Sequence, residues 1–84
     1  MNAKHARTLE AIFADPVRSG LYWRDIVALL RAAGAEIRQG EGSRLRVRLG
    51  GVRATFHEPH PEKTTDKGAV KSVRLFLESA GVKP

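Results

Sequence analysis

The sequence has no cysteine among its 84 residues, so neither a disulfide nor a thiolate metal site can reinforce the fold. A chain of this length buries only about 60% of its unfolded surface or slightly more, which predicts one domain, residues 1–84, with a thin core. The lack of cysteine is typical of a reducing compartment, and we expect a cytoplasmic location. No apolar run approaches the roughly 18 residues that span a bilayer, so we expect no segment of the chain to span a membrane.

Aromatic residues are also scarce, with one Trp, one Tyr and three Phe. None of them interleaves with the arginines, which argues against a protein that binds single strands by stacking bases. Gly40 and Gly42 are not followed by the lysine of a phosphate-binding loop. The sequence 57–60 holds two histidines and a glutamate, but Pro59 interrupts them and no thiolate is present. We therefore expect neither a metal ion nor a small-molecule cofactor.

Positive charge is what the sequence has in excess. Lys and Arg total 15 against 9 Asp and Glu, which gives a net charge of +6 and a pI of about 10.5. Residues 44–57 hold four arginines and no acid, whereas the remainder of the chain is close to balanced. Such a concentration predicts a polyanionic partner: a nucleic acid, an acidic protein or an anionic membrane surface.

The same segment, residues 44–57, has the clearest strand pattern in the chain. Apolar and polar residues alternate on both sides of Gly50-Gly51, and a pair of glycines suits a two-residue turn that needs positive φ. Turn and alternation agree on one register, in which all the apolar side chains share a face. On the other face this register pairs Arg44 with His57, Arg46 with Thr55, and Arg48 with Arg53.

The other segments complete an α+β pattern. Residues 35–39 are expected to form a short strand before a flexible loop. Three segments have the period of an amphipathic helix: 4–14, 23–33, and a last helix that is capped by Thr65 or Asp66 and ends at Gly81. The order α-α-β-β-β-α predicts a three-stranded antiparallel sheet with helices packed on its apolar face. We expect Trp23 in the core and His5 on the exposed side of the first helix.

The polar side of the predicted hairpin is the candidate binding surface, and we call it the arginine face. Arg44, Arg46 and Arg48 would project from one strand about 6.5–7 Å apart, with Arg53 beside Arg48. Guanidinium groups present forked donors suited to phosphate. A face made basic only for solubility is the alternative, but such surfaces usually mix both signs of charge. Spacing alone does not decide between RNA, DNA and an acidic protein.

Histidine supplies the candidate catalytic groups, because it titrates near neutral pH and can accept the proton of an RNA 2′-hydroxyl. His57 ends the arginine face opposite Arg44, whose cation could stabilise charge on a phosphate. A polar strand residue without a catalytic role is the alternative. His60, held between Pro59 and Pro61, is the second candidate for catalysis or a phosphate contact, or a loop anchor.

Residues 23–82 resemble the HicA family of toxins from toxin–antitoxin systems. The resemblance is carried by the order of several short segments: the helix that ends at Gly34, Gly42-Ser43 before the central strand, the hairpin, Pro59-His60-Pro61, Asp66-Lys67-Gly68, and Ala80-Gly81. The helix at 4–14 looks like an extension of the family domain. The resemblance implies a double-stranded-RNA-binding-like fold, cleavage of mRNA independently of the ribosome, and neutralisation by an acidic HicB-type antitoxin.

One position departs from the family pattern. In the family the Gly-Ser pair is followed by the catalytic histidine, whereas here Ser43 is followed by Arg44. We expect a toxin that binds mRNA through Ser43 and the arginine face and cleaves it without metal, with His57 as the base and His60 as the second candidate. The alternative is a non-catalytic relative that binds only RNA or the antitoxin.

Overall fold

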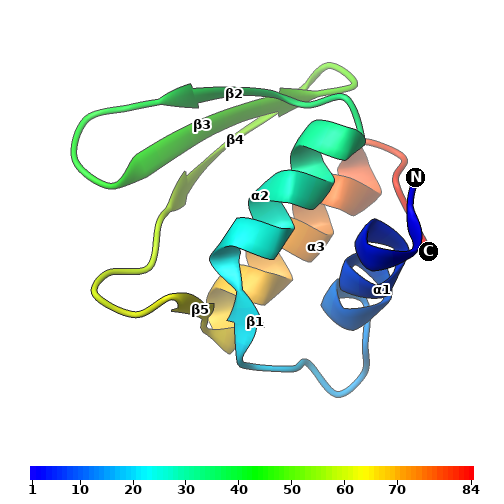
Figure 1. Cartoon of the computed structure of the whole chain (residues 1–84). Helices are drawn as coiled ribbons and strands as arrows, with labels where there is room; N and C mark the ends of the chain where they lie inside the picture. Colours follow the sequence, from blue (N-terminus) through cyan, green and yellow to red (C-terminus); the bar gives the residue numbers. More distant parts are fainter.

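All 84 residues are described by a computed structural model, and its elements follow the predicted order with two short strands added (Figure 1). The predicted α+β fold, with a three-stranded antiparallel sheet and helices on one of its faces, is confirmed. None of the helices has the length and apolar composition needed to cross a membrane. The elements are α1 (Ala3–Ile12), β1 (Leu21–Tyr22), α2 (Trp23–Ala32), β2 (Glu36–Gln39), β3 (Arg44–Leu49), β4 (Val52–His57), β5 (Thr64–Thr65) and α3 (Lys67–Ser79).

The sheet has the order β2-β3-β4, and both neighbouring pairs are antiparallel. The register predicted for the hairpin is confirmed from Arg44, which faces His57, to Leu49, which faces Val52. Gly50 and Gly51 make the turn with φ of 57° and 80°. A residue with a Cβ atom adopts such angles only with strain, so the two glycines allow the short turn that sets the register.

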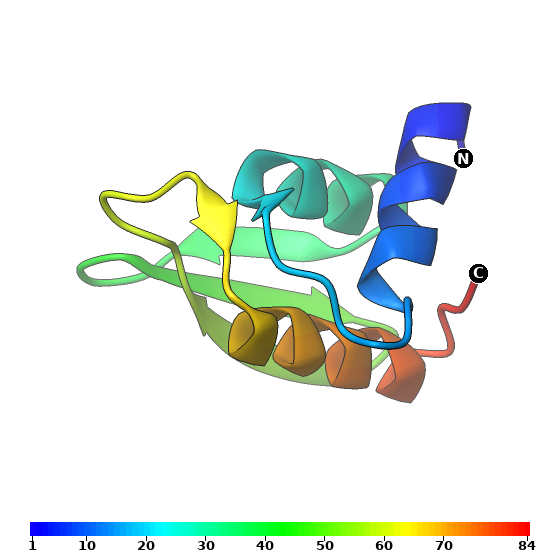
Figure 2. The same ribbon diagram turned by 90° about the horizontal axis from the view of Figure 1, so that it is seen from below.

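Helices α2 and α3 lie side by side on one face of this sheet, and α1 packs against both of them at one end (Figures 1 and 2). The aromatic ring of Phe56 on β4 joins the layers. It meets Trp23 at the start of α2 edge-on, with 6.1 Å between ring centroids, and Phe76 of α3 in the same way at 5.7 Å. Trp23 is buried, so its predicted place in the core is confirmed.

A two-stranded sheet formed by β1 and β5 was not predicted. Leu21 pairs with Thr65 and Tyr22 with Thr64, and the backbone N–H of Trp23 donates to the carbonyl of Lys63 at 3.0 Å. Each strand has only two residues, which is too short for a side-chain period to show in a sequence. The pairing ties the start of α2 to the segment that enters α3.

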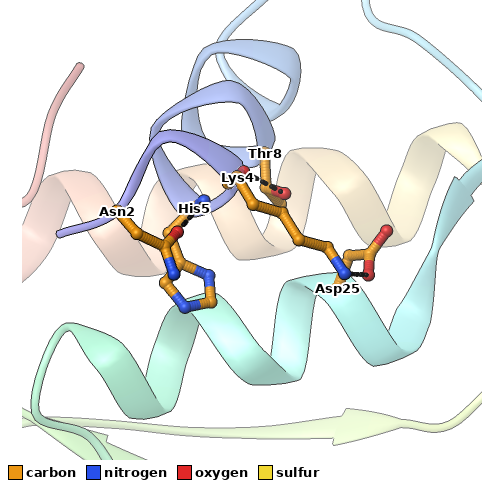
Figure 3. Close-up of polar contacts among 5 residues, drawn as sticks. All are labelled: Asn2, Lys4, His5, Thr8 and Asp25. Atoms are coloured by element: carbon orange, nitrogen blue, oxygen red, sulfur yellow. Dashed lines mark hydrogen bonds and ion pairs between the residues drawn. The ribbon is translucent and has the colours of Figure 1, made fainter.

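The buried side of α1 differs from the prediction. His5 is partly buried rather than exposed as expected, and its neighbour Ala6 is exposed. Figure 3 shows the imidazole of His5 on the side of α1 that faces α2, where Lys4 also forms an ion pair with Asp25 at 3.4 Å. His5 has the same helical phase as Leu9 and Ile12, which are buried in the core. Packing against α2 therefore decides which side of α1 is buried. The methyl group of Ala6 is too small to decide it.

Arg74 of α3 holds the end of α1. Its Nε donates to the carbonyl of Ile12 at 2.9 Å, and its terminal nitrogen donates to the carbonyl of Ala14 at 2.7 Å. The last carbonyls of a helix lack partners within the helix, and a cation there also interacts favourably with the helix dipole. The helix ends at Ile12, two residues before the predicted end, and the side chain of Arg74 takes the place of a further turn.

We predict that Arg74→Met destabilises the protein by about 1.5–3 kcal/mol, because it leaves two carbonyls without a charged donor. Urea unfolding followed by circular dichroism measures the change. Arg7→Met is the matched control, since Arg7 lies exposed on α1 and makes no hydrogen bond or ion pair through its side chain. Equal midpoints for the two variants would show that Arg74 does not anchor α1.

Candidate nucleic-acid interface

The face of the sheet that points away from the helices carries the arginines, and Figure 1 shows that no helix covers it. Cross-strand partners point to the same side of a sheet, so the registers arrange these side chains in rows. One row runs across all three strands from Arg38 through Arg46 to Thr55. The next row contains Glu36, Arg48 and Arg53 in the same order of strands. At the other end, Arg44 stands beside His57.

The backbone hydrogen bonds of the hairpin set how closely these side chains approach. The N–H of Glu58 donates to the carbonyl of Ser43 at 2.7 Å, which makes this the hydrogen-bonded pair just beyond the strands. Hydrogen-bonded and non-hydrogen-bonded pairs alternate along an antiparallel ladder, so Arg44 and His57 form a non-hydrogen-bonded pair. Arg48 and Arg53, four positions further along the ladder, also form a non-hydrogen-bonded pair. Side chains start closest together in such pairs, so Arg48 and Arg53 project from neighbouring positions, as do Arg44 and His57.

Glu36 on β2 neutralises one arginine of the face. Its carboxylate accepts a hydrogen bond from Arg48 at 2.6 Å, and both side chains remain half-exposed. Residues 44–57 contain no acidic residue, but the folded sheet places Glu36 of β2 on the arginine face. The remaining arginines of the face have no acidic partner within 4.0 Å: Arg38, Arg44, Arg46 and Arg53.

Arg38 is the residue of this face that sequence reasoning missed. Ile37 of β2 packs against the core, and the alternation of side chains along a strand therefore turns Arg38 outward. The pairing of β2 with β3 decides which arginine lies beside Arg38, and it places Arg38 directly opposite Arg46. The loop between these strands has no turn pattern as specific as the two glycines of the hairpin, so the pairing could not be inferred.

The turn between β2 and β3 positions Arg44. Its backbone carbonyl accepts the N–H of Gly40 at 2.8 Å and the side-chain amide of Gln39 at 3.2 Å. A Cβ atom on Gly40 would lie 3.3 Å from the Cβ of Arg44, so only glycine fits this approach without displacement. Ser43 is exposed at the edge of this turn, beside the arginine face.

The two candidate histidines occupy different settings. His57 is the last residue of β4, exposed, and its imidazole makes no hydrogen bond within the chain. His60 is exposed in the connection between β4 and β5, outside the sheet. Register therefore pairs His57 with Arg44, whereas His60 has no cross-strand partner. No three or more His, Asp or Glu side chains gather into a group that could hold a metal ion.

A shallow pocket lies over the middle of the arginine face. Three arginines of the hairpin, Arg38 and the Glu36 carboxylate surround it, and Thr55 adds a hydroxyl. Four of its eight lining residues are arginines, which suit phosphate groups better than an apolar ligand. The lining residues are Glu36, Arg38, Arg46, Val47, Arg48, Arg53, Ala54 and Thr55.

Comparison with known proteins gives one match. The family model described as the HicA toxin of bacterial toxin–antitoxin systems matches residues 23–82, which cover α2, the whole sheet and α3. The search of curated proteins found no match, and the search of solved structures found none. The matched segment contains every residue of the arginine face and both candidate histidines, and leaves out α1. Because the match covers well over half of the chain, this protein belongs to the HicA family of toxins from bacterial toxin–antitoxin systems.

Proposed function

We propose that this toxin binds mRNA on the arginine face and cleaves it, and that it acts in the cytoplasm, where mRNA is found. Membership of the family implies an antitoxin partner. The observation that carries the proposal is the set of four exposed arginines on one uncovered sheet face with no acidic partner. Positive groups held close together are unfavourable in the free protein, and a polyanion relieves this repulsion when it binds.

The spacing of the arginines suits a nucleic-acid backbone. Alternate residues of a strand lie about 6.5–7 Å apart, and neighbouring strands lie about 4.8 Å apart. Arg44 and Arg46 on β3 and Arg38 on β2 therefore present three forked donors within reach of successive phosphates. No aromatic ring lies among them, so the contacts are to phosphate and sugar, which favours binding with little base preference at these positions.

His57 is the proposed base for cleavage, because it is the histidine that the register places beside an arginine of this face. Its imidazole would accept the proton of a 2′-hydroxyl, and the 2′-oxygen would attack the adjacent phosphorus. The bond from phosphorus to the 5′-oxygen then breaks, and that oxygen takes a proton from water or from His60. Arg44 would stabilise the charge that develops on the phosphate. The products are a 2′,3′-cyclic phosphate and a 5′-hydroxyl end, and no metal enters the reaction.

A second candidate function is RNA binding without cleavage. Two points favour it: the resemblance of Gly42-Ser43 to the family pattern implies that Arg44 takes the place of the catalytic histidine, and no group of the chain hydrogen-bonds the imidazole of His57 to orient it. Catalytic histidines are usually oriented by such a partner. In this case the toxin would block translation by occupying mRNA, and the phosphate contacts would be the same.

We predict that the arginines of the face determine how binding to single-stranded RNA weakens with increasing salt. Arg46→Ala should weaken binding and reduce the slope of log K against log salt by about 0.7, because one phosphate contact is lost. Arg38→Ala should do the same. Arg48→Ala should change the slope less, since Glu36 already pairs with Arg48. Fluorescence anisotropy measures these values.

Arg7→Ala on α1, away from the sheet, is the matched control for the loss of one positive charge. If Arg7→Ala reduces the slope as much as Arg46→Ala, the binding is a non-specific effect of net charge and the arginine face is not the site.

We predict that cleavage of RNA depends on His57. His57→Gln should lower the rate on a long mRNA about 10²–10⁴-fold while leaving RNA affinity nearly unchanged, because it removes the base but keeps a polar side chain. Addition of EDTA should leave the wild-type rate unchanged. Gel electrophoresis of the products measures the rate, and growth arrest after induction in bacteria gives an independent readout.

His60→Gln serves as the matched control. A wild-type protein that binds RNA but yields no product would establish the binding-only function. Full activity of His57→Gln would remove His57 from the mechanism, and a larger loss in His60→Gln than in His57→Gln would assign the base to His60.

A further inference from the structure

Strand β4 leaves one edge of the sheet without a partner. It pairs with β3 on one side only, because the order of the sheet is β2-β3-β4 (Figure 2). Hydrogen-bonded and non-hydrogen-bonded pairs alternate between β3 and β4, so the backbone N–H and C=O groups of residues 52, 54 and 56 bond to β3. The N–H and C=O groups of Arg53, Thr55 and His57 therefore point outward. Such an edge is a template for another strand.

A groove runs along this edge between β4 and α3. On the helix side it is bordered by three small residues that lie along one side of α3, Ala69, Ser72 and Ser79, which leave room beside the strand. Leu75 projects there with 64% of its surface exposed, one of only three large apolar residues exposed in the chain. The groove thus combines unpaired backbone groups with an exposed apolar contact, the two features that a bound strand uses.

The two sides of an added strand would meet different chemistry. Alternate residues point to opposite faces, so every second side chain would lie beside Arg53, Thr55 and His57 on the arginine face. The intervening side chains would lie toward Leu75 and the small residues of α3. Charge complementarity requires acidic residues in the first set, and the apolar contact favours aliphatic residues in the second.

We propose that an extended segment of an acidic partner protein, with alternating acidic and aliphatic residues, binds here as a fourth strand beside β4. The inference rests on the family's antitoxin partner and deepens it, because it names the surface and the pattern of the segment. A second copy of this chain fits less well. Antiparallel pairing of two β4 strands would set two arginine faces edge to edge, with Arg53 beside His57 of the other copy.

The position of the groove also connects it to the proposed function. A fourth strand would bring carboxylates next to Arg53 and His57, at the margin of the surface proposed for RNA. These carboxylates would occupy the cations that phosphates need and would repel the RNA backbone. One segment of the partner would thereby neutralise the toxin without covering the whole arginine face.

The test uses the full chain and an acetylated heptapeptide in which glutamate and valine alternate. Nuclear magnetic resonance follows hydrogen exchange at the amides of Arg53, Thr55 and His57. These amides should exchange rapidly in the free protein and at least tenfold more slowly with saturating peptide. A peptide with its glutamates and valines in two separate blocks is the control, and it should give no such protection.

Variants of α3 separate the groove from the arginine face. Leu75→Ser should weaken binding of the alternating peptide about tenfold, because an apolar contact is lost. Ser72→Tyr, which fills the groove, should weaken it at least as much. Lys71→Ser is the matched control, since Lys71 is exposed on the same helix and does not line the groove. All three variants should bind RNA as the wild type does.

Several outcomes would overturn the proposal. Equal binding of both peptides without protection of the three amides would mean adsorption to the arginine face alone, and no binding of the alternating peptide would exclude the groove. Protection without peptide, together with a dimer in gel filtration, would assign the edge to a second copy. Failure of the proposed function is seen separately, as a wild-type protein that does not bind RNA.

Discussion

The pairing of β3 with β4 is the constraint on which both the core and the arginine face depend. Side chains alternate along a strand, so a slip by one residue would turn Leu45, Val47 and Phe56 toward water and the arginines toward the helices. Because Phe56 contacts aromatic rings on both α2 and α3, the register also sets how the helices meet the sheet. One alignment, imposed by a two-glycine turn, therefore builds the interior and the surface together.

The arginine face is an unfavourable arrangement for the protein alone. Non-hydrogen-bonded pairs bring Arg48 and Arg53 close together, and Arg46 stands opposite Arg38. Glu36 offsets one of these charges, and the remaining repulsion is tolerated because the opposite face of the same strands is well packed. Proteins commonly accept such local destabilisation where a ligand will bind. The uncompensated cations are therefore better explained by a polyanionic partner than by solubility.

Strand β4 has two proposed roles. Its arginine and histidine side chains take part in the proposed RNA surface, and its outer backbone edge offers hydrogen bonds to a protein partner. The two roles share the same residues because backbone and side chains of one strand point in different directions. A partner strand on this edge would meet the proposed base from the side opposite Arg44. Inhibition then needs no conformational change in the toxin.

The sequence by itself determined the hairpin and the core position of Trp23, and it narrowed the cap of the last helix to Thr65 or Asp66, of which the structure has Asp66, because each rests on residues close in the chain. Tertiary structure decided what depends on distant segments: the pairing of β1 with β5, the orientation of α1, the place of Arg38 beside Arg46, and the Glu36–Arg48 ion pair. Arg74 is the clearest case, since it bonds carbonyls about 60 residues away that no local pattern could connect to it. Local alternation determines which side chains share a face. Only packing between segments decides which faces meet, because that depends on contacts between residues far apart in the chain.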